Sequence, residues 1–243
     1  MTYNRYAMPV DPRVLKKDFE SSSEVDDLGA LSRMIQRKLI PFKNANPIYL
    51  KIIHTKLHSL WKNIDSRIGI NLRDREKLLP HFTLLGEAVP SKPVKVIYRG
   101  VRLSSYDPNL LSKTYPTIKK GEVISNPQDP KVLAHLESLA YGLRSWAEGK
   151  GTALGWAKGL KGNTIDPKRD KVVFVYPTPN IIFNASQYWK AIDKYHPDEM
   201  ERWDNEDSAP FDFDEQIAFL QNPKIQEISF DKTQGVWFVV VSD

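Results

Sequence analysis

The spacing of the apolar residues changes near Val94, and this change constrains the fold more than any other feature of the chain. From residue 25 to residue 85, apolar side chains such as Leu28, Leu31 and Ile35 recur every three or four positions, which is the period of an amphipathic helix. After Val94 the chain carries short β-branched and aromatic runs that are typical of strands. Helices first and many short strands afterwards predict an α+β fold rather than a doubly wound parallel sheet.

The expected elements divide the chain into three parts. Residues 1–24 read as an N-terminal arm, residues 25–93 as a helical portion packed on the core, and residues 94–243 as the core itself. Within the core we predict the following elements: strands at 94–98, 122–125, 171–176, 180–183, 216–220, 225–230 and 236–241, and helices at 130–143 and 153–161.

Composition excludes several classes of protein and site. No run of eighteen apolar residues exists, so no membrane span is expected, and the N-terminus lacks the apolar stretch of a secretory signal. Cysteine is absent, which excludes disulfides and catalytic thiols and fits a reducing cytoplasm. His54 and His58 alone among the five histidines stand four apart, in a Leu/Ile-rich stretch without a neighbouring Glu, so we expect no metal.

The net charge leaves two kinds of partner open. The chain carries a formal charge of +5, and the stretch from Asp198 to Asp214 is strongly acidic, so the remainder is more basic than the total indicates. A basic surface attracts an acidic partner such as a nucleotide, a nucleic acid or an acidic protein. Basic residues interleaved with aromatic ones between Lys51 and Arg67 keep a nucleic-acid-binding protein as an alternative.

Three segments carry residues suited to chemistry, and they occur in a fixed order. Tyr98-Arg99-Gly100 follows the first strand, and the stretch from Gly121 to Ser125 leads through a helix to Ser145-Trp146-Ala147. An acidic edge beginning at Phe213 then opens directly into a strand. The nucleotide-binding patterns GxGxxG and GxxxxGK[ST] are both missing, so neither a Rossmann nor a P-loop mode of binding is supported.

This order resembles the mono-ADP-ribosyltransferase superfamily, whose pattern is Arg, then Ser-x-Ser/Thr, then Glu-x-Glu, and it is most similar to phage enzymes of the Mod and Alt type. The resemblance spans residues 94–241. It implies two short packed β-sheets flanked by helices, with NAD as co-substrate and no metal. The implied activity is cleavage of the nicotinamide–ribose bond and transfer of ADP-ribose to a host macromolecule.

The resemblance also implies roles for individual residues. Arg99 would pair the NAD diphosphate with its planar fork, and Gly100 would let the backbone approach the cofactor closely. Ser145 would hold the ribose and the catalytic acid. Tyr98, Trp146 and Asn184, which flank these positions or lie in the segment resembling the phosphate–nicotinamide loop, complete the implied cofactor-binding set.

The sequence departs from the pattern at the catalytic acid. The family register places Gln216 where a glutamate is expected, directly after Glu215. A deliberate Glu→Gln replacement, a register shifted by one, and a natural variant with weak or no activity are the three explanations. Because side chains alternate along a strand, Glu215 and Gln216 cannot both face one cleft. We favour Gln216 as the marker of the catalytic position and keep Glu215 as the alternative.

The acceptor of ADP-ribose follows only from the resemblance. The loop before the catalytic strand contacts the target in the family, which makes Trp203, Phe211, Phe213 and Asp214 the expected substrate-binding residues. We expect an arginine on a protein of the transcription or translation machinery, such as an RNA polymerase, a ribosome-associated protein or an RNA-linked acceptor. The protein is expected to be a monomer in the host cytoplasm. An NAD glycohydrolase and a degenerate NAD-binding module remain open.

Overall fold

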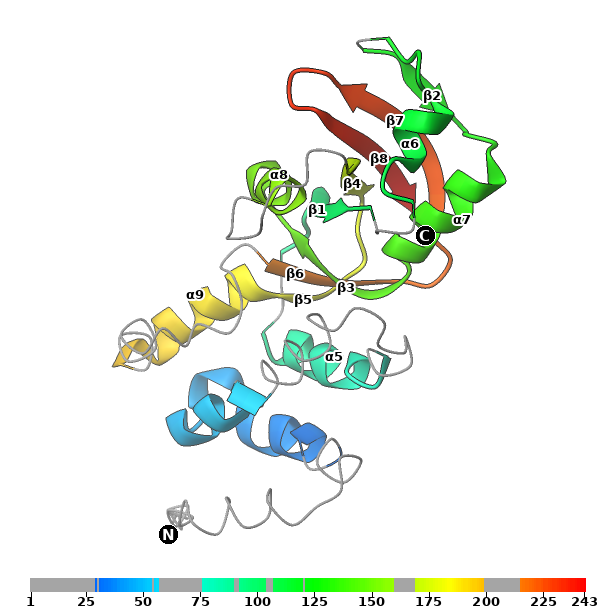
Figure 1. The fold of residues 1–243 in the computed structure, drawn as a ribbon. Coiled ribbons are helices and arrows are strands. Elements are labelled where there is room, and N and C mark those ends of the chain that lie inside the picture. Colours follow the sequence, from blue (N-terminus) through cyan, green and yellow to red (C-terminus); the bar gives the residue numbers. More distant parts are fainter. Residues whose placement is uncertain are drawn as a thin grey trace, which may run out of the picture.

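The structure is a computed structural model that describes residue 29 and residues 31–53, 55–56, 76–89, 92–103, 107–119, 121–159, 169–198 and 215–243. The N-terminal arm expected at residues 1–24 lies outside these residues. Helices precede strands along the described chain, and Figure 1 shows the N-terminal helices as a separate layer beside the strands. The predicted α+β class is therefore confirmed.

The helical portion consists of short pieces because prolines interrupt it. Residues 31–34 are helical and continue into η1 (Ile35–Leu39), while η2 (Phe42–Asn44) follows Pro41 and another helix covers residues 47–53. The segment α5 (Leu79–Ala88) begins with a proline in its first turn, where the missing N–H costs no helical hydrogen bond. Their buried side chains recur at helical spacing, as the sequence predicts.

The core contains the seven strands that the apolar runs predict, some with shifted boundaries, and one further strand at residues 142–147 that they do not predict. The helix predicted at 153–161 lies at residues 150–158. The first strand continues through Gly100 to Arg102 instead of ending at Tyr98, because the backbone keeps pairing with the neighbouring strand. The predicted helix at 130–143 ends at Ala140, since Gly142 adopts a left-handed φ of 81° and starts a new strand. The strands are β1 (Val96–Arg102), β2 (Val123–Ser125), β3 (Gly142–Ala147), β4 (Lys171–Pro177), β5 (Ile181–Asn184), β6 (Glu215–Leu220), β7 (Lys224–Asp231) and β8 (Val236–Ser242).

The helices of the core are α6 (Leu110–Thr114), α7 (Pro130–Ala140), α8 (Lys150–Lys158) and α9 (Ala185–Tyr195). The Asp129 side chain caps α7 by accepting hydrogen bonds from two backbone amides of its first turn. Asn184 caps α9 in the same way. Neither α6 nor α9 is among the elements predicted from the sequence, because their apolar residues are few or follow directly on a strand.

The strands form one hydrogen-bonded sheet in the order β2-β7-β8-β4-β1-β3-β6-β5. Every pair is antiparallel except β4 with β8, which is parallel. Strands β1 and β3 meet at one residue pair, Tyr98 with Ala147. The two short sheets expected from the sequence are therefore two parts of one sheet, a mixed five-stranded part and an antiparallel three-stranded part, joined at this pair.

The two parts of the sheet support different hydrophobic cores. The N-terminal helices and α9 pack against the three-stranded part, where Leu143, Phe183 and Ile217 are fully or almost fully buried. Helices α6 and α7 pack with the five-stranded part around Trp146 and Trp237. Burial of this apolar surface supplies the main driving force for both contacts. The point where the two parts join carries the candidate site.

Candidate functional site

Three of the residues predicted to carry chemistry lie together where β1, β3 and β6 meet. The Arg99 guanidinium in β1 donates a hydrogen bond from Nη1 to the Ser145 backbone carbonyl over 2.7 Å. The Ser145 hydroxyl in β3 donates to Oε1 of Glu215 in β6 over 2.5 Å. A cation, a hydroxyl and a carboxylate from strands far apart in the sequence therefore form one connected series.

The strand register explains why Ser145 reaches Glu215. Strands β3 and β6 are antiparallel, with Ser145 opposite Ile217 and Ala147 opposite Glu215. Residues that lie opposite each other share a face of the sheet, and so do residues two positions apart. Ser145 and Glu215 are therefore diagonal neighbours on one face. Both are largely buried, at 6% and 8% exposure, so little water competes with the contact.

Gln216 lies on the opposite face of β6 from this pair. It is fully buried, and its Nε2 donates a hydrogen bond over 3.2 Å to Oδ1 of Asn184 on the neighbouring strand. Its Oε1 has no hydrogen-bond partner among the described residues. The strand alternation thus separates the two candidate positions for the catalytic acid. Glu215 faces Ser145, and Gln216 does not.

Asn184, a predicted cofactor-binding residue, links a strand to a helix. Its Oδ1 accepts hydrogen bonds from the backbone N–H of Gln187 over 3.0 Å and from Gln216. Only 3% of its surface is exposed. These two contacts account for the carbonyl oxygen, so the observed role of Asn184 is to cap α9.

Tyr98 and Gly100 face the helix α8 rather than open space. Tyr98 is half-buried and packs with Ala153 and Ala157 of this helix. A Cβ atom placed on Gly100 would lie 1.8 Å from the Ala153 carbonyl oxygen, far inside van der Waals contact. The sequence predicts that Gly100 lets the backbone approach the cofactor; in this structure the group that comes close to Gly100 is the backbone of α8.

The side chain of Trp146 belongs to the hydrophobic core. It is fully buried, and its ring contacts that of Tyr176 with the centroids 5.7 Å apart. It shares its sheet face with Gln216, its cross-strand neighbour, and lies on the opposite face from Ser145. The alternation of β3 turns this indole into the core, and the expectation that it contacts a cofactor stays a prediction.

The four residues expected to bind the acceptor, Trp203, Phe211, Phe213 and Asp214, lie outside the described residues, as do His54 and His58. Within the described part of the chain, no three His, Asp or Glu side chains are grouped to hold a metal ion. None of the described helices combines the length and the apolar character that crossing a bilayer requires.

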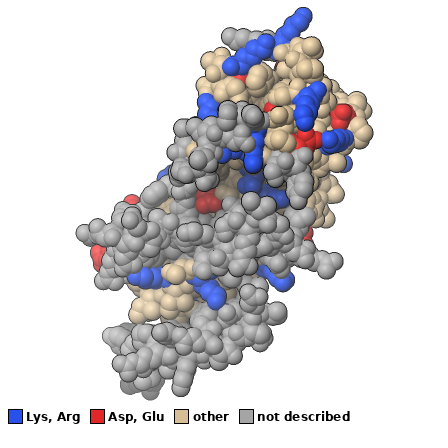
Figure 2. All heavy atoms as spheres, in the orientation of Figure 1, with Lys and Arg blue, Asp and Glu red and all other residues tan. Residues whose placement is uncertain are grey.

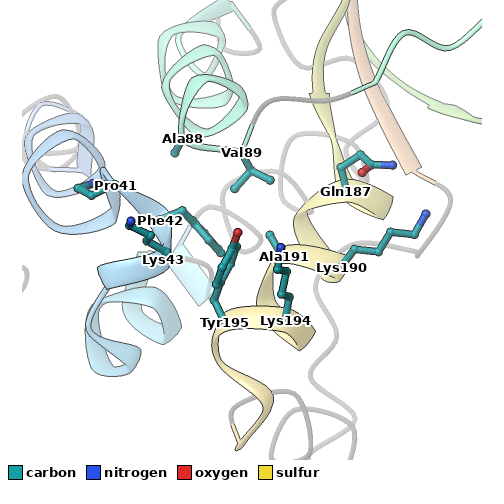
Figure 3. A pocket seen from close by; sticks show the side chains of 10 residues that line it. All are labelled: Pro41, Phe42, Lys43, Ala88, Val89, Gln187, Lys190, Ala191, Lys194 and Tyr195. Atoms are coloured by element: carbon teal, nitrogen blue, oxygen red, sulfur yellow. The ribbon is translucent and has the colours of Figure 1, made fainter.

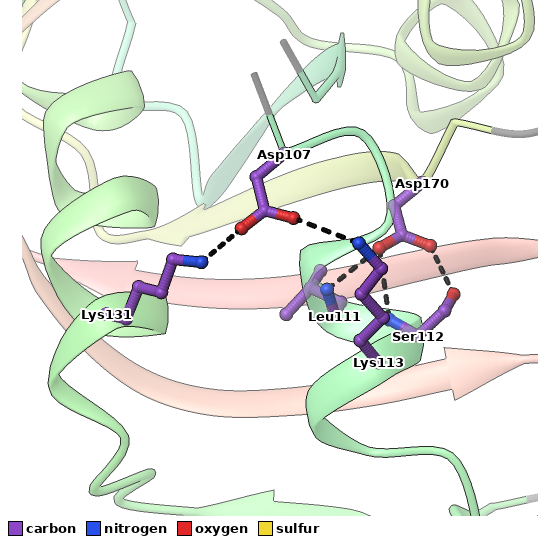
Figure 4. Close-up of polar contacts among 6 residues, drawn as sticks. All are labelled: Asp107, Leu111, Ser112, Lys113, Lys131 and Asp170. Carbon is purple, nitrogen blue, oxygen red and sulfur yellow. Dashed lines mark hydrogen bonds and ion pairs between the residues drawn. The ribbon is translucent and has the colours of Figure 1, made fainter. Parts of the chain in front are cut away.

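Asp170 is a buried carboxylate that the sequence does not single out. Its Oδ2 accepts hydrogen bonds from the backbone amides of Leu111 and Ser112 over 2.8 and 3.0 Å. Its Oδ1 accepts from the Ser112 hydroxyl and, over 3.3 Å, from the Trp237 indole. Figure 4 shows the contacts with α6 beside a separate group, in which Asp107 contacts Lys113 and Lys131 and the hydrogen bond from Lys131 lowers the pKa of Asp107. A single Asp before a strand gives no pattern from which this position could be found.

Comparison with known proteins gives distant structural neighbours. No family model and no curated protein matches the chain. Among solved structures, the ADP-ribosyltransferase Vis in complex with an inhibitor is 11% identical with a TM-score of 0.32, over 90% of this chain and 85% of Vis. C3larvin toxin, an ADP-ribosyltransferase from Paenibacillus larvae, is 12% identical with a TM-score of 0.27, over 98% of this chain and 96% of the toxin.

Proposed function

We propose that the chain is an NAD-dependent mono-ADP-ribosyltransferase whose catalytic acid is Glu215. The observation that carries this proposal is the connected series from Arg99 through Ser145 to the buried carboxylate of Glu215. These are the residue types, in the order along the chain, that the sequence motifs associate with this chemistry. The acceptor in this proposal is an arginine side chain of a host protein, as in the phage enzymes that the motifs resemble.

The chemistry of nicotinamide release suits these side chains. Breaking the bond between nicotinamide and ribose builds positive charge on the sugar, as in glycoside hydrolysis. A carboxylate at Glu215 stabilises that charge electrostatically, and the Ser145 hydroxyl holds the carboxylate in position. The Arg99 guanidinium offers a planar fork for a diphosphate, and its bond to the Ser145 carbonyl fixes where the fork lies.

The first experiment measures nicotinamide release from NAD by the purified chain and by Glu215→Gln. We expect the substitution to lower turnover by about a hundredfold or more, because it removes a charge placed for the transition state. Glu227→Gln, an exposed glutamate in β7, is the matched control and retains full turnover. Equal turnover of Glu215→Gln and the unchanged chain would refute this proposal.

A second variant, Gln216→Glu, tests the assignment of the acid. Because Gln216 is fully buried beside the Asn184 oxygen, a glutamate there costs about 3 kcal/mol of stability and does not raise turnover. A large rise in turnover would instead show that position 216 is catalytic and that the chain carries a disabling glutamine.

Labelled NAD and a bacterial lysate distinguish transfer from hydrolysis. Transfer predicts a labelled protein band that is lost with Glu215→Gln and is released from the protein by chemistry that cleaves an arginine-linked sugar. Nicotinamide release without any labelled protein would identify an NAD glycohydrolase, which uses the same charge stabilisation but passes the sugar to water.

A further inference from the structure

A groove on the N-terminal side of the molecule has the chemistry of a peptide-docking surface. It has a volume of about 390 Å³ and lies between residues 41–43, the C-terminal end of α5 and one side of α9. Figure 3 shows Lys43 on one side of the groove and Lys190 and Lys194 on the other. None of the residues that form the connected series at the sheet junction lines it.

The described residues that line the groove carry charges of one sign. The charged ones among them are Lys43, Lys190 and Lys194, all exposed, and none of these described lining residues is Asp or Glu. None of the three forms an ion pair with a described residue; the Lys194 ammonium lies 5.0 Å from the centre of the Tyr195 ring. Asp193 belongs to the same helix but is not part of the lining. The described part of the lining therefore carries positive charge, which attracts an acidic ligand.

The remaining described lining is largely apolar. Phe42, which is buried, and the half-buried Val89 and Ala191 contribute to the walls, and Tyr195 is 42% exposed. Tyr195 is therefore the large lining side chain that a partner could contact most readily. An apolar surface beside charged groups favours a segment that carries both acidic and apolar side chains.

The groove is held in its shape by contacts beneath it. The His196 ring lies 3.1 Å from the Phe42 carbonyl oxygen through Nε2, which must donate because the carbonyl can only accept. The Phe42 ring packs edge-on against Tyr188 and His196, with centroids 5.6 and 5.8 Å apart. These contacts tie the 41–43 segment to α9, so a ligand meets a preformed surface and loses little affinity to ordering.

From these observations we infer that the groove binds an acidic segment of a partner protein, with glutamate or aspartate side chains on the three lysines and an apolar side chain against Tyr195 and Val89. A nucleic acid fits less well, because the described lining residues include no arginine and no flat aromatic strip. On the face seen in Figure 2, the described Lys and Arg side chains also lie in several separate places rather than in one continuous stripe. The inference does not depend on the proposed reaction.

The test is a binding titration by fluorescence anisotropy with a labelled peptide of repeated Glu-Glu-Leu units. The protein variants are a triple reversal, Lys43→Glu with Lys190→Glu and Lys194→Glu, and a control of equal charge change at the exposed residues Lys119, Lys224 and Lys232. We expect the groove variant to lose about tenfold to a hundredfold in affinity, and the control to lose less than about threefold. Added salt weakens the wild-type complex.

A second variant tests the apolar part. Tyr195→Ser lowers affinity for the Glu-Glu-Leu peptide by about fivefold and leaves binding of an all-Glu peptide unchanged. The inference is overturned if the control and groove variants lose affinity equally, if Tyr195→Ser changes nothing, or if a single-stranded DNA oligonucleotide binds more tightly than the peptide. All titrations are repeated with Glu215→Gln in the absence of NAD, and we expect this variant to bind the peptide as the unchanged chain does. Peptide binding is thereby tested separately from the proposed reaction.

Discussion

Among the described residues two carboxylates are buried, those of Asp170 and Glu215, and their surroundings differ although their exposure is nearly the same, at 6% and 8%. Asp170 accepts from two backbone amides, a hydroxyl and an indole, and so ties α6 to the β4 and β8 region. Glu215 accepts from a serine hydroxyl whose own backbone is held by an arginine. Burial by itself therefore does not identify a reactive acid. The neighbouring groups distinguish the two acids, because amides that pair a carboxylate permanently serve structure, while the serine that bonds to Glu215 also connects it to the cation of Arg99.

The strongest test of this contrast is Asp170→Ala. Removing the carboxylate leaves two amides and an indole without their acceptor inside the protein, so we expect a loss of about 3–5 kcal/mol in the free energy of unfolding. Urea titration followed by circular dichroism measures the loss. Turnover of NAD per folded molecule stays close to that of the unchanged chain. A variant as stable as the parent would mean that water replaces this network at no cost.

Two arginine substitutions, Arg99→Lys and Arg144→Lys, test whether a cation contributes to substrate binding or only to stability. Arg144 also donates to backbone carbonyls, those of Tyr141 and Ser138, and lies in the same strand as Ser145. We expect Arg99→Lys to raise the KM for NAD by about tenfold, because lysine cannot present the planar fork. Arg144→Lys instead lowers the unfolding free energy and leaves KM unchanged. Steady-state kinetics measures the KM of both variants, and urea titration measures their unfolding free energy. An unchanged KM for Arg99→Lys would show that Arg99 does not bind NAD.

The smallest expected effects come from Ser145. Ser145→Ala removes one hydrogen bond to Glu215, which costs about 1 kcal/mol in stability. It also lowers kcat, by less than about tenfold, because the carboxylate keeps its charge but loses its orientation. Thermal unfolding and nicotinamide release measure the two effects. Full turnover in this variant would show that Ser145 has a structural role only, like the Ser112 hydroxyl that donates to Asp170.

The sequence predicts the order of the elements well because apolar spacing reports burial directly. It places β4, β7 and β8 within one or two residues of their observed bounds. It cannot decide between Glu215 and Gln216, since both precede the same apolar run and the register of β6 against β3 depends on tertiary pairing. For the same reason it does not show that the Trp146 side chain lies in the core. The lysines of the groove come from segments about 150 positions apart, so no local pattern joins them.

The contact between Gly100 and the Ala153 carbonyl has a consequence for how this chain changes over evolutionary time. Any larger residue at position 100 would push α8 off the sheet, so selection for folding alone preserves the glycine. A descendant that had lost all catalytic activity would keep it. Arg99 has no such protection from helix packing, and its replacement beside an intact glycine would be the first trace of a lineage drifting from catalysis to some other use of the fold.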